Sequence, residues 1–247
     1  MTYAKDGYEI CNRLVDTGRI EAIRQKMIAI MAPHCDCPAD QPDSLDQCFY
    51  AIAAQGQDLK TNVYRLFGRL ADVPLLLGDL GVSGKVAAYG FTNYTIQAYS
   101  VFCLEPGNTK HMFLPHQDLR DRTSRKSLII WVPLSVGANR GGLALYPGTH
   151  RKGPLKHDLS PGGQLLLGEN AFADSARRDI TEFEFGDCVF VDPYLIHESI
   201  ENQGDGIRWT AVIKIDDASG QAHVRDSIHP FDIDDYIDSR SNAERLN

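Results

Sequence analysis

The sequence predicts a mainly β fold of the sandwich or jelly-roll type, with a helical N-terminal segment packed on one sheet. Two observations support this prediction. Apolar residues recur every three to four positions through roughly the first 80 residues, which is the spacing of amphipathic helices. From about residue 95, short runs rich in valine, isoleucine and aromatic residues alternate with turn residues, which is typical of antiparallel strands.

Three helices are expected in the N-terminal segment. The first covers residues 20–31, and Asp16-Thr17 before it supplies a plausible N-cap. The second covers residues 58–70, and the third covers residues 73–80 and ends near Gly81. These helices make residues 1–82 a mostly helical preface to the β-rich part of the chain.

Six strands are expected in the second part of the chain. Glycine- and proline-containing turns separate several of them, as at residues 105–107, 147–148 and 204–206. The expected strands are residues 95–104, 126–134, 142–146, 180–185, 188–192 and 207–215. We interpret residues 1–247 as a single domain with a jelly-roll core at 95–215 and a polar covering tail at 216–247.

Composition narrows the choice of partner and compartment. The chain has 247 residues, 43% of them hydrophobic, and a net charge of -8, which disfavours nucleic acid or an anionic membrane as the main partner. No apolar run approaches the ~20 residues that a membrane helix needs, and no signal peptide is apparent. We therefore expect a cytoplasmic protein with reduced cysteines and a small-molecule substrate. The oligomeric state is not predicted.

The strongest functional signal is a pair of residues spaced for metal binding, followed by a distant third residue. His116 and Asp118 are two positions apart, so in extended backbone both side chains lie on one side while Gln117 points away. His197 follows much later in the chain. Two histidines and one carboxylate on one face of an octahedron form the facial triad of iron(II) oxygenases.

Arg208 and Ser199 are expected to lie on the metal side of the fold. If residues 202–205 form the loop of a hairpin, Ser199 faces Arg208 and His197 faces Thr210. This register places a guanidinium and a hydroxyl beside the metal, where they suit a carboxylate.

The second half of the chain resembles the phytanoyl-CoA dioxygenase family. The resemblance runs from about Gln97 to Ile215 and rests on several separate motifs. They are HQDL at 116–119, Trp131 in the next strand, GGLALYPGTHRKG at 141–153, GDCVFVDPYLIHES at 186–199, and Arg208 after His197.

The resemblance implies a double-stranded β-helix that couples decarboxylation of 2-oxoglutarate to hydroxylation of an unactivated C–H bond, with Fe(II) and O2. It implies that the iron ligands are His116, Asp118 and His197. It also implies that Arg208 and Ser199 bind the far carboxylate of 2-oxoglutarate, with Trp131 beside the cosubstrate and Gln97 or Tyr99 in further contact. The carboxylate ligand argues against halogenation, because halogenating members replace it with a small residue.

Purely structural interpretations of the same residues are also compatible with the sequence. Arg208 can be a cross-strand ion-pair partner, Ser199 an ordinary strand hydroxyl, and Trp131 a core residue. Arg120 and Arg122 lie just past the metal motif, where they form either a solvated loop or a lid that contacts a polar or anionic substrate.

Two other functions compete with the hydroxylase. One is a cupin-like metal enzyme that does not use 2-oxoglutarate and has no need of Arg208 and Ser199. The other is a non-catalytic jelly-roll binding module with a relic metal cluster. The substrate cannot be predicted, and desaturation or epimerisation is not separable from hydroxylation by sequence.

Overall fold

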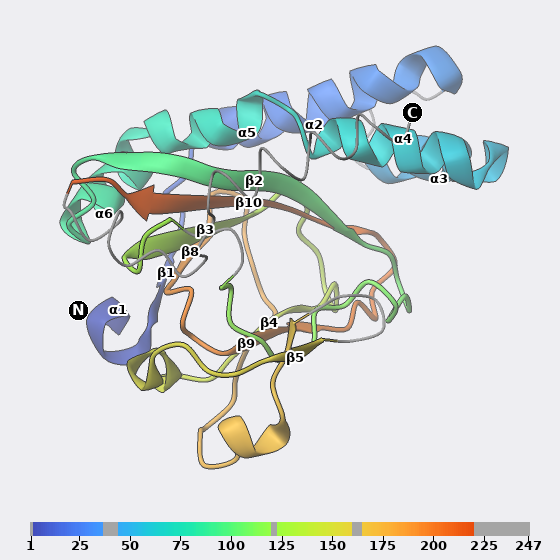
Figure 1. Ribbon diagram of the computed structural model, residues 1–247. Helices are drawn as coiled ribbons and strands as arrows, with labels where there is room; N and C mark the ends of the chain where they lie inside the picture. Colours follow the sequence, from blue (N-terminus) through green and yellow to red (C-terminus); the bar gives the residue numbers. More distant parts are fainter. Residues whose placement is uncertain (1, 37–43, 120–122, 160–164, 220–247) are drawn as a thin grey trace, which may run out of the picture.

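Two antiparallel sheets face each other, and helices cover the outer face of the larger one (Figure 1). The computed structural model describes residues 2–36, 44–119, 123–159 and 165–219. The large sheet contains, in spatial order, β1 (Tyr8–Cys11), β8 (Cys188–Val191), β3 (Ser127–Pro133), β10 (Arg208–Asp217) and β2 (Tyr94–Leu104). The small sheet contains β7 (Arg178–Ile180), β4 (Gly142–Leu145) and β9 (His197–Ile200). This arrangement confirms the predicted jelly roll with helices on one sheet.

The helical elements lie mainly before β2. The α-helices are α1 (Thr2–Asp6), α2 (Thr17–Met31), α3 (Ser44–Gln55), α4 (Gln57–Phe67), α5 (Asp72–Leu75) and α6 (Leu80–Ala88). Short 3-10 turns occupy Ala32–His34, Leu76–Gly78, Thr149–Lys152 and Glu169–Ala171. A separate two-stranded ribbon consists of β5 (Asp158–Leu159) and β6 (Leu165–Leu166).

The first predicted helix is confirmed together with its cap. The Asp16 carboxylate accepts a hydrogen bond from the Gly18 N–H at 2.8 Å, which satisfies one of the free amides of the first turn of α2. The helix buries one apolar face against the sheet. The residues on this face are Ile20, Ile23, Met27, Ile28 and Met31.

The third predicted helix is wrong in its extent. The chain forms α5 and then a 3-10 turn, and α6 begins at Leu80. The Asp79 side chain accepts from the Gly81 N–H at 3.0 Å, so this position is a helix N-cap. Gly81 therefore lies in the first turn of a helix instead of ending one.

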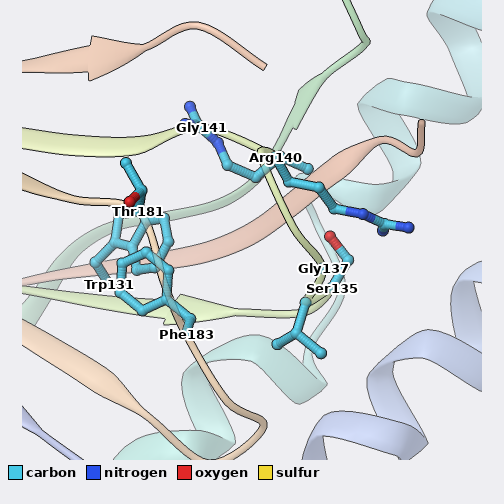
Figure 2. A pocket seen from close by; sticks show the side chains of 9 residues that line it. Trp131, Ser135, Gly137, Arg140, Gly141, Thr181 and Phe183 are labelled. Atoms are coloured by element: carbon cyan, nitrogen blue, oxygen red, sulfur yellow. The ribbon is translucent and has the colours of Figure 1, made fainter. Parts of the chain in front are cut away.

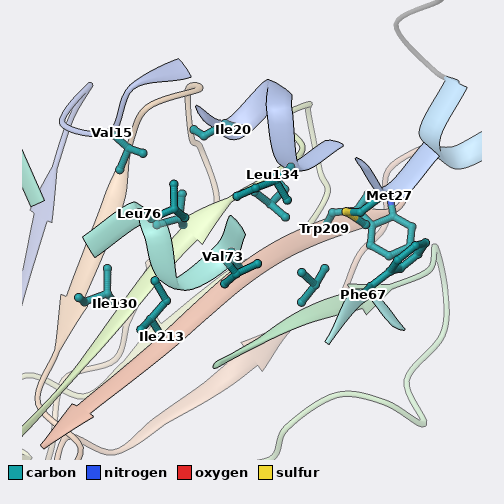
Figure 3. Close-up of a cluster of buried hydrophobic side chains, with 14 of the residues drawn as sticks. Val15, Ile20, Met27, Phe67, Val73, Leu76, Ile130, Leu134, Trp209 and Ile213 are labelled. Carbon is teal, nitrogen blue, oxygen red and sulfur yellow. The ribbon is translucent and has the colours of Figure 1, made fainter. Parts of the chain in front are cut away.

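The main hydrophobic core lies between the helices and the outer face of the large sheet (Figure 3). Trp209 is fully buried there, and its ring contacts Phe49 at 4.9 Å and Phe67 at 5.8 Å between centroids. Asp46 on α3 accepts from the Trp209 indole N–H at 2.7 Å and from the Ile207 amide at 2.8 Å. The helices are thus joined to β10 by packing and by a half-buried carboxylate.

The inner face of the large sheet has a different composition. Along β10, the residues with odd numbers from Trp209 to Ile215 pack in the outer core. The alternate residues Arg208, Thr210, Val212 and Lys214 line a cavity between the sheets. This alternation follows from the two-residue period of a strand.

The hairpin expected between β9 and β10 is wrong. β9 pairs with β4, where His197 is opposite Leu145, whereas β10 pairs with β2 and β3. The segment between them crosses from one sheet to the other. Asn202, fully buried in this crossing, donates to the carbonyl oxygens of Leu104 and Gly206 at 2.7 and 2.8 Å, which anchors the connection. Ser199 and Arg208 are therefore not ladder partners.

The strand expected at residues 180–185 ends earlier. β7 stops at Ile180, and the following residues leave the ladder. Phe183 instead packs its ring against Trp131 at 4.7 Å between centroids, which takes it out of the strand alternation.

In the part of the chain that the structure describes, no helix is long and apolar enough to cross a membrane. Most of the expected tail, residues 220–247, lies outside the described residues.

Candidate metal centre

Backbone hydrogen bonds bring His116 and Asp118 to β9. His116 and His197 form an antiparallel bridge, in which the amide of each donates to the carbonyl oxygen of the other at 3.0 Å. The Asp118 amide donates to the Pro193 carbonyl oxygen at 2.9 Å. The motif after β2 is thereby aligned with the third histidine, although the two lie far apart in the sequence.

Gln117 points away from this cluster, as expected, and fixes the loop from behind. It is fully buried, and its side-chain amide donates to the carbonyl oxygens of Gly153 and Tyr194 at 2.9 and 2.6 Å. Its side-chain oxygen accepts from the Leu155 amide at 2.8 Å. Its backbone amide donates to His157 Nε2 at 3.0 Å. All these groups are satisfied, so the loop is held rigidly.

Both imidazoles present the same nitrogen to the centre of the cluster. His116 Nδ1 lies 2.7 Å from the Leu114 carbonyl oxygen, and His197 Nδ1 lies 2.9 Å from the Leu195 carbonyl oxygen. A carbonyl oxygen only accepts, so each Nδ1 carries the proton and each Nε2 keeps its lone pair. Orientation of a histidine ligand by such a backbone contact is usual at metal sites.

The ligand atoms of His116, Asp118 and His197 all lie within 4.8 Å of one another. His116 Nε2 is 3.4 Å from Asp118 Oδ1, and the two imidazole centroids are 4.3 Å apart. The cluster therefore offers two nitrogens and one carboxylate oxygen to a single point. This donor set fits a non-haem iron(II) ion.

The protonation states also suit a metal. Burial lowers the pKa of His197 to about 4, with a further contribution from the neighbouring His116. Burial alone would raise the pKa of Asp118, but the charge of the Lys214 ammonium, together with a contribution from the neighbouring His116, outweighs it and holds that pKa well below its usual range. At neutral pH His197 is thus neutral and Asp118 ionised, as metal ligands must be.

A cavity of about 890 Å³ opens beside the cluster. Its volume lies in the upper part of the range of small-molecule sites. The three clustered side chains line it, and so do four of the residues predicted to contact the cosubstrate, namely Arg208, Ser199, Trp131 and Gln97.

Arg208 is a half-buried cation that has no counter-ion among the described residues. Its guanidinium donates to the carbonyl oxygens of Gly142 and Ile200 at 2.8 and 3.0 Å. Among the residues that the structure describes, no carboxylate lies within ion-pair distance of it, so it is not a cross-strand ion-pair partner. Burial lowers the pKa of Arg208 to about 10, which leaves it charged at neutral pH.

Ser199 reaches the same cavity from the opposite sheet. Its hydroxyl oxygen accepts from the Phe113 amide at 3.2 Å, which leaves the hydroxyl proton available for another acceptor. Its backbone amide donates to the Phe113 carbonyl oxygen at 2.8 Å. The predicted proximity of Ser199 to the cavity is therefore met without the predicted hairpin.

Trp131 lines two cavities. One is the large cavity, and the other is a small cavity that Arg208 also lines. Figure 2 shows the ring of Trp131 against that of Phe183, while the Arg140 side chain extends away from both. Trp131 is thus both a packed residue and a wall of the site.

Gln97 and Tyr99 do not share a face. The pairing of β10 with β2 shifts between Lys214 and Ile215, so that Ala98 and Ile96 are paired and Gln97 is left over in a bulge. Gln97 lines the cavity, whereas Tyr99 packs with the helix-side core. Tyr99 as a cosubstrate contact is therefore wrong, because the bulge changes the side-chain alternation.

Arg120 and Arg122 lie outside the described residues. Sequence reasoning missed two other features of the site. Lys214 pairs with Asp118 at 2.8 Å between Nζ and Oδ2, and it was identifiable as the third alternate residue after Arg208. Phe102 and Phe113, whose rings meet edge to face at 5.5 Å, form an apolar wall.

A jelly roll that holds two histidines and one carboxylate beside a deep cavity is typical of the non-haem metal oxygenases. The chain belongs to the phytanoyl-CoA dioxygenase family, whose model matches residues 3–210. The match includes the helical preface as well as the motifs of the second half. The chain is 38% identical to the peroxisomal phytanoyl-CoA dioxygenase of Rattus norvegicus over 102 residues, which span 38% of this chain and 30% of that protein.

Two solved structures illustrate the shared fold. The epimerase SnoN in complex with Fe3+, alpha ketoglutarate and nogalamycin RO has a TM-score of 0.55 at 19% identity, covering 88% of this chain and 82% of SnoN. EctD from S. alaskensis with 2-oxoglutarate and 5-hydroxyectoine has a TM-score of 0.52 at 18% identity, covering 88% and 74%. At these identities the similarity establishes the jelly-roll fold.

Proposed function

We propose that this protein is an Fe(II)- and 2-oxoglutarate-dependent dioxygenase that hydroxylates an unactivated C–H bond of a small organic substrate and releases succinate and CO2. One observation carries the proposal. A two-histidine, one-carboxylate cluster lines the same cavity as a half-buried arginine for which the described part of the chain provides no counter-ion.

His116, Asp118 and His197 hold the iron in this proposal. Three ligands on one face of an octahedron leave three positions open, enough for a chelating keto acid and O2. The backbone carbonyls that fix both imidazoles also keep their Nε2 atoms directed to the metal before it binds. Bound iron and 2-oxoglutarate supply the oxidising chemistry.

Arg208 and Ser199 bind the far carboxylate of 2-oxoglutarate. A buried guanidinium gains more from a carboxylate than an exposed one does, because little water screens the pair. The carbonyl oxygens of Gly142 and Ile200 hold Nη1, so the guanidinium is oriented before the ligand arrives. The Ser199 hydroxyl adds a neutral donor, and Trp131 provides a flat apolar wall.

Gln97 contacts the cosubstrate nearer to the metal. The β2 bulge directs its side chain into the cavity at the level of Lys214, which in turn contacts a metal ligand. Arg208 lies six residues before Lys214 on β10. In this proposal Gln97 therefore binds one end of the cosubstrate and Arg208 binds the other.

The rest of the cavity excludes water and places the substrate. Phe102 and Phe113 pack edge to face beside His116, whose ring lies 5.6 Å from that of Phe113. An apolar wall next to the metal favours a substrate with an apolar part at the reacting carbon. Whether such a site hydroxylates or epimerises depends on that placement, and we propose hydroxylation.

The competing functions explain fewer of these features. A cupin-like enzyme without 2-oxoglutarate has no use for the unpaired charge of Arg208. A binding module has no need for two imidazoles held in the ligand tautomer. Both alternatives therefore leave groups that cost free energy to bury without a compensating partner.

The proposal is tested by succinate formation. Metal-free protein is loaded with Fe(II) and supplied with 2-oxoglutarate in air, with and without a panel of small organic substrates. We expect slow succinate release with 2-oxoglutarate alone and faster release, matched by hydroxylated product, with a substrate. His197→Ala is the control and should release none above background. Fe(II)-loaded wild-type protein that neither binds 2-oxoglutarate nor forms succinate would contradict the proposal.

A further inference from the structure

Lys214 is a charged residue on the inner face of an otherwise apolar part of β10. It follows Val212 on this face, and its ladder partners are Ala98 on β2 and Ile129 on β3. Its side chain lines the cavity and is only 27% exposed. A lysine in such a place needs a partner, because an ammonium loses hydration on burial.

That partner is the carboxylate of the metal cluster. Lys214 Nζ lies 2.8 Å from Asp118 Oδ2, and the Asp118 side chain is 17% exposed. The other oxygen, Oδ1, lies 3.4 Å from His116 Nε2. The two oxygens of one carboxylate thus face different partners, Oδ1 the His116 imidazole and Oδ2 the Lys214 ammonium.

We infer that Lys214 is a positioning residue, which reserves one oxygen of Asp118 and thereby keeps this side chain a one-oxygen metal ligand. The inference rests on the proposed function, because it concerns the ion that this function needs. A carboxylate can bind a cation through one oxygen or through both. An ammonium at hydrogen-bond distance from Oδ2 disfavours the second mode, since the metal would have to displace it.

The number of oxygens matters for the positions left open. With one oxygen from Asp118 and two histidine nitrogens, half of an octahedron remains available. With both oxygens bound, a chelating keto acid would fill the remaining two positions and leave none for O2. Lys214 therefore protects an open position through its contact with Asp118.

This arrangement has an electrostatic consequence with a definite sign. The ammonium is a like charge near a dication and also competes for the carboxylate, so it weakens metal binding. A variant protein with an uncharged residue at this position should bind metal more tightly and 2-oxoglutarate more weakly. A merely structural ion pair would not change the two affinities in opposite directions.

The test compares Lys214→Met with Lys214→Arg, each titrated with Co(II) and then, as the Co(II) protein, with 2-oxoglutarate. Co(II) stands in for iron without turnover, and calorimetry gives both affinities. For Lys214→Met we expect Co(II) to bind about tenfold more tightly and 2-oxoglutarate about tenfold more weakly. Lys214→Arg keeps charge and reach, so both affinities should stay within about threefold of wild type.

Two results would overturn the inference. One is a Lys214→Met protein whose 2-oxoglutarate affinity stays within about threefold of wild type. The other is a Lys214→Arg protein that behaves like Lys214→Met. Failure of wild-type Co(II) protein to bind 2-oxoglutarate at all would instead count against the proposed function, so the two failures are distinguishable.

A measurement on the wild-type protein covers the case in which Lys214→Met does not fold. A crystal structure of the wild-type Co(II) complex should show Asp118 bound through Oδ1 alone, with Oδ2 still in contact with Lys214. Coordination through both oxygens would refute the inference without any variant.

Discussion

The two faces of β10 divide stability from chemistry within one strand. On the outer face, Trp209, Ala211, Ile213 and Ile215 are all fully buried against the helices. On the inner face, the alternate residues line the cavity, and two of them carry a positive charge. Because side chains alternate along a strand, residues only about 3.3 Å apart along the strand have different roles, one in stability and the next in the cavity.

The two faces differ in whether their polar groups are satisfied within the fold or need a ligand. On the helix-facing side of this strand, the Asp46 carboxylate of α3 is satisfied within the fold, because it accepts from the Trp209 indole and the Ile207 amide. On the cavity side, Arg208 keeps an unpaired charge within the described residues. Such a group becomes fully compensated only when a ligand arrives.

The largest expected effect belongs to the cavity side. His197→Ala removes one of the three proposed metal ligands, whose ring is held by the Leu195 carbonyl oxygen, so we expect divalent metal affinity to fall about a thousandfold. Calorimetric titration of the metal-free protein with Co(II) measures it. The melting temperature of the metal-free variant should stay close to that of wild type, and a normal affinity would break the assignment of His197.

Arg208→Ala should separate the cosubstrate from the metal. Loss of the buried guanidinium is expected to weaken 2-oxoglutarate binding about a hundredfold, because the carboxylate loses charged hydrogen bonds. Metal affinity should change less than about threefold. Arg208→Lys is the matched control, which keeps the charge without the fork and should give an intermediate loss. Equal weakening of metal and 2-oxoglutarate would show that Arg208 supports the cluster instead.

Trp209→Phe tests the opposite face. It leaves the Asp46 oxygen without its indole donor and leaves a void against Phe49, so the free energy of unfolding should fall by about 2 kcal/mol. Urea denaturation followed by circular dichroism measures this change. The affinity of the folded protein for Co(II) should be unchanged. A large loss of metal affinity would mean that the two faces are not independent.

The smallest effect is expected in the pH dependence of the metal-free protein. The pKa of folded His197 is about 4, below its ordinary value of 6.5, so the unfolded chain takes up the proton first. The stability from neutral His197 is complete above about pH 6.5 and is lost progressively as the pH falls from 6.5 to 4. Denaturation at several pH values measures it. His197→Gln should flatten this segment of the profile, whereas an unchanged profile would exclude His197 as its source.

Residue type and local spacing were enough to predict which three side chains come together, because this prediction depends less on the exact strand pairing. His116 and Asp118 meet His197 through a bridge that sequence does not reveal, yet the three were identifiable from residue type and family motif. The helical spacing of Leu45, Cys48, Phe49 and Ile52 would equally have predicted α3.

Two incorrect predictions, the β9–β10 hairpin and the shared face of Gln97 and Tyr99, concern strand pairing, which depends on the whole fold. A short polar connection before Arg208 reads like a hairpin turn, but here it crosses between sheets because β9 has a better partner in β4. The β2 bulge moved Gln97 to the cavity side and left Tyr99 on the helix side. A single extra residue in a strand reverses the faces of those beyond it, and local sequence carries little sign of it.

We propose that the metal cluster and Arg208 bind one ligand in one cavity. The most direct test is anaerobic titration of the Fe(II)-loaded protein with 2-oxoglutarate, followed by visible absorption. We expect a weak charge-transfer band that saturates with one 2-oxoglutarate per iron and needs far more cosubstrate in Arg208→Ala. Stoichiometric iron without any band at saturating 2-oxoglutarate would contradict it.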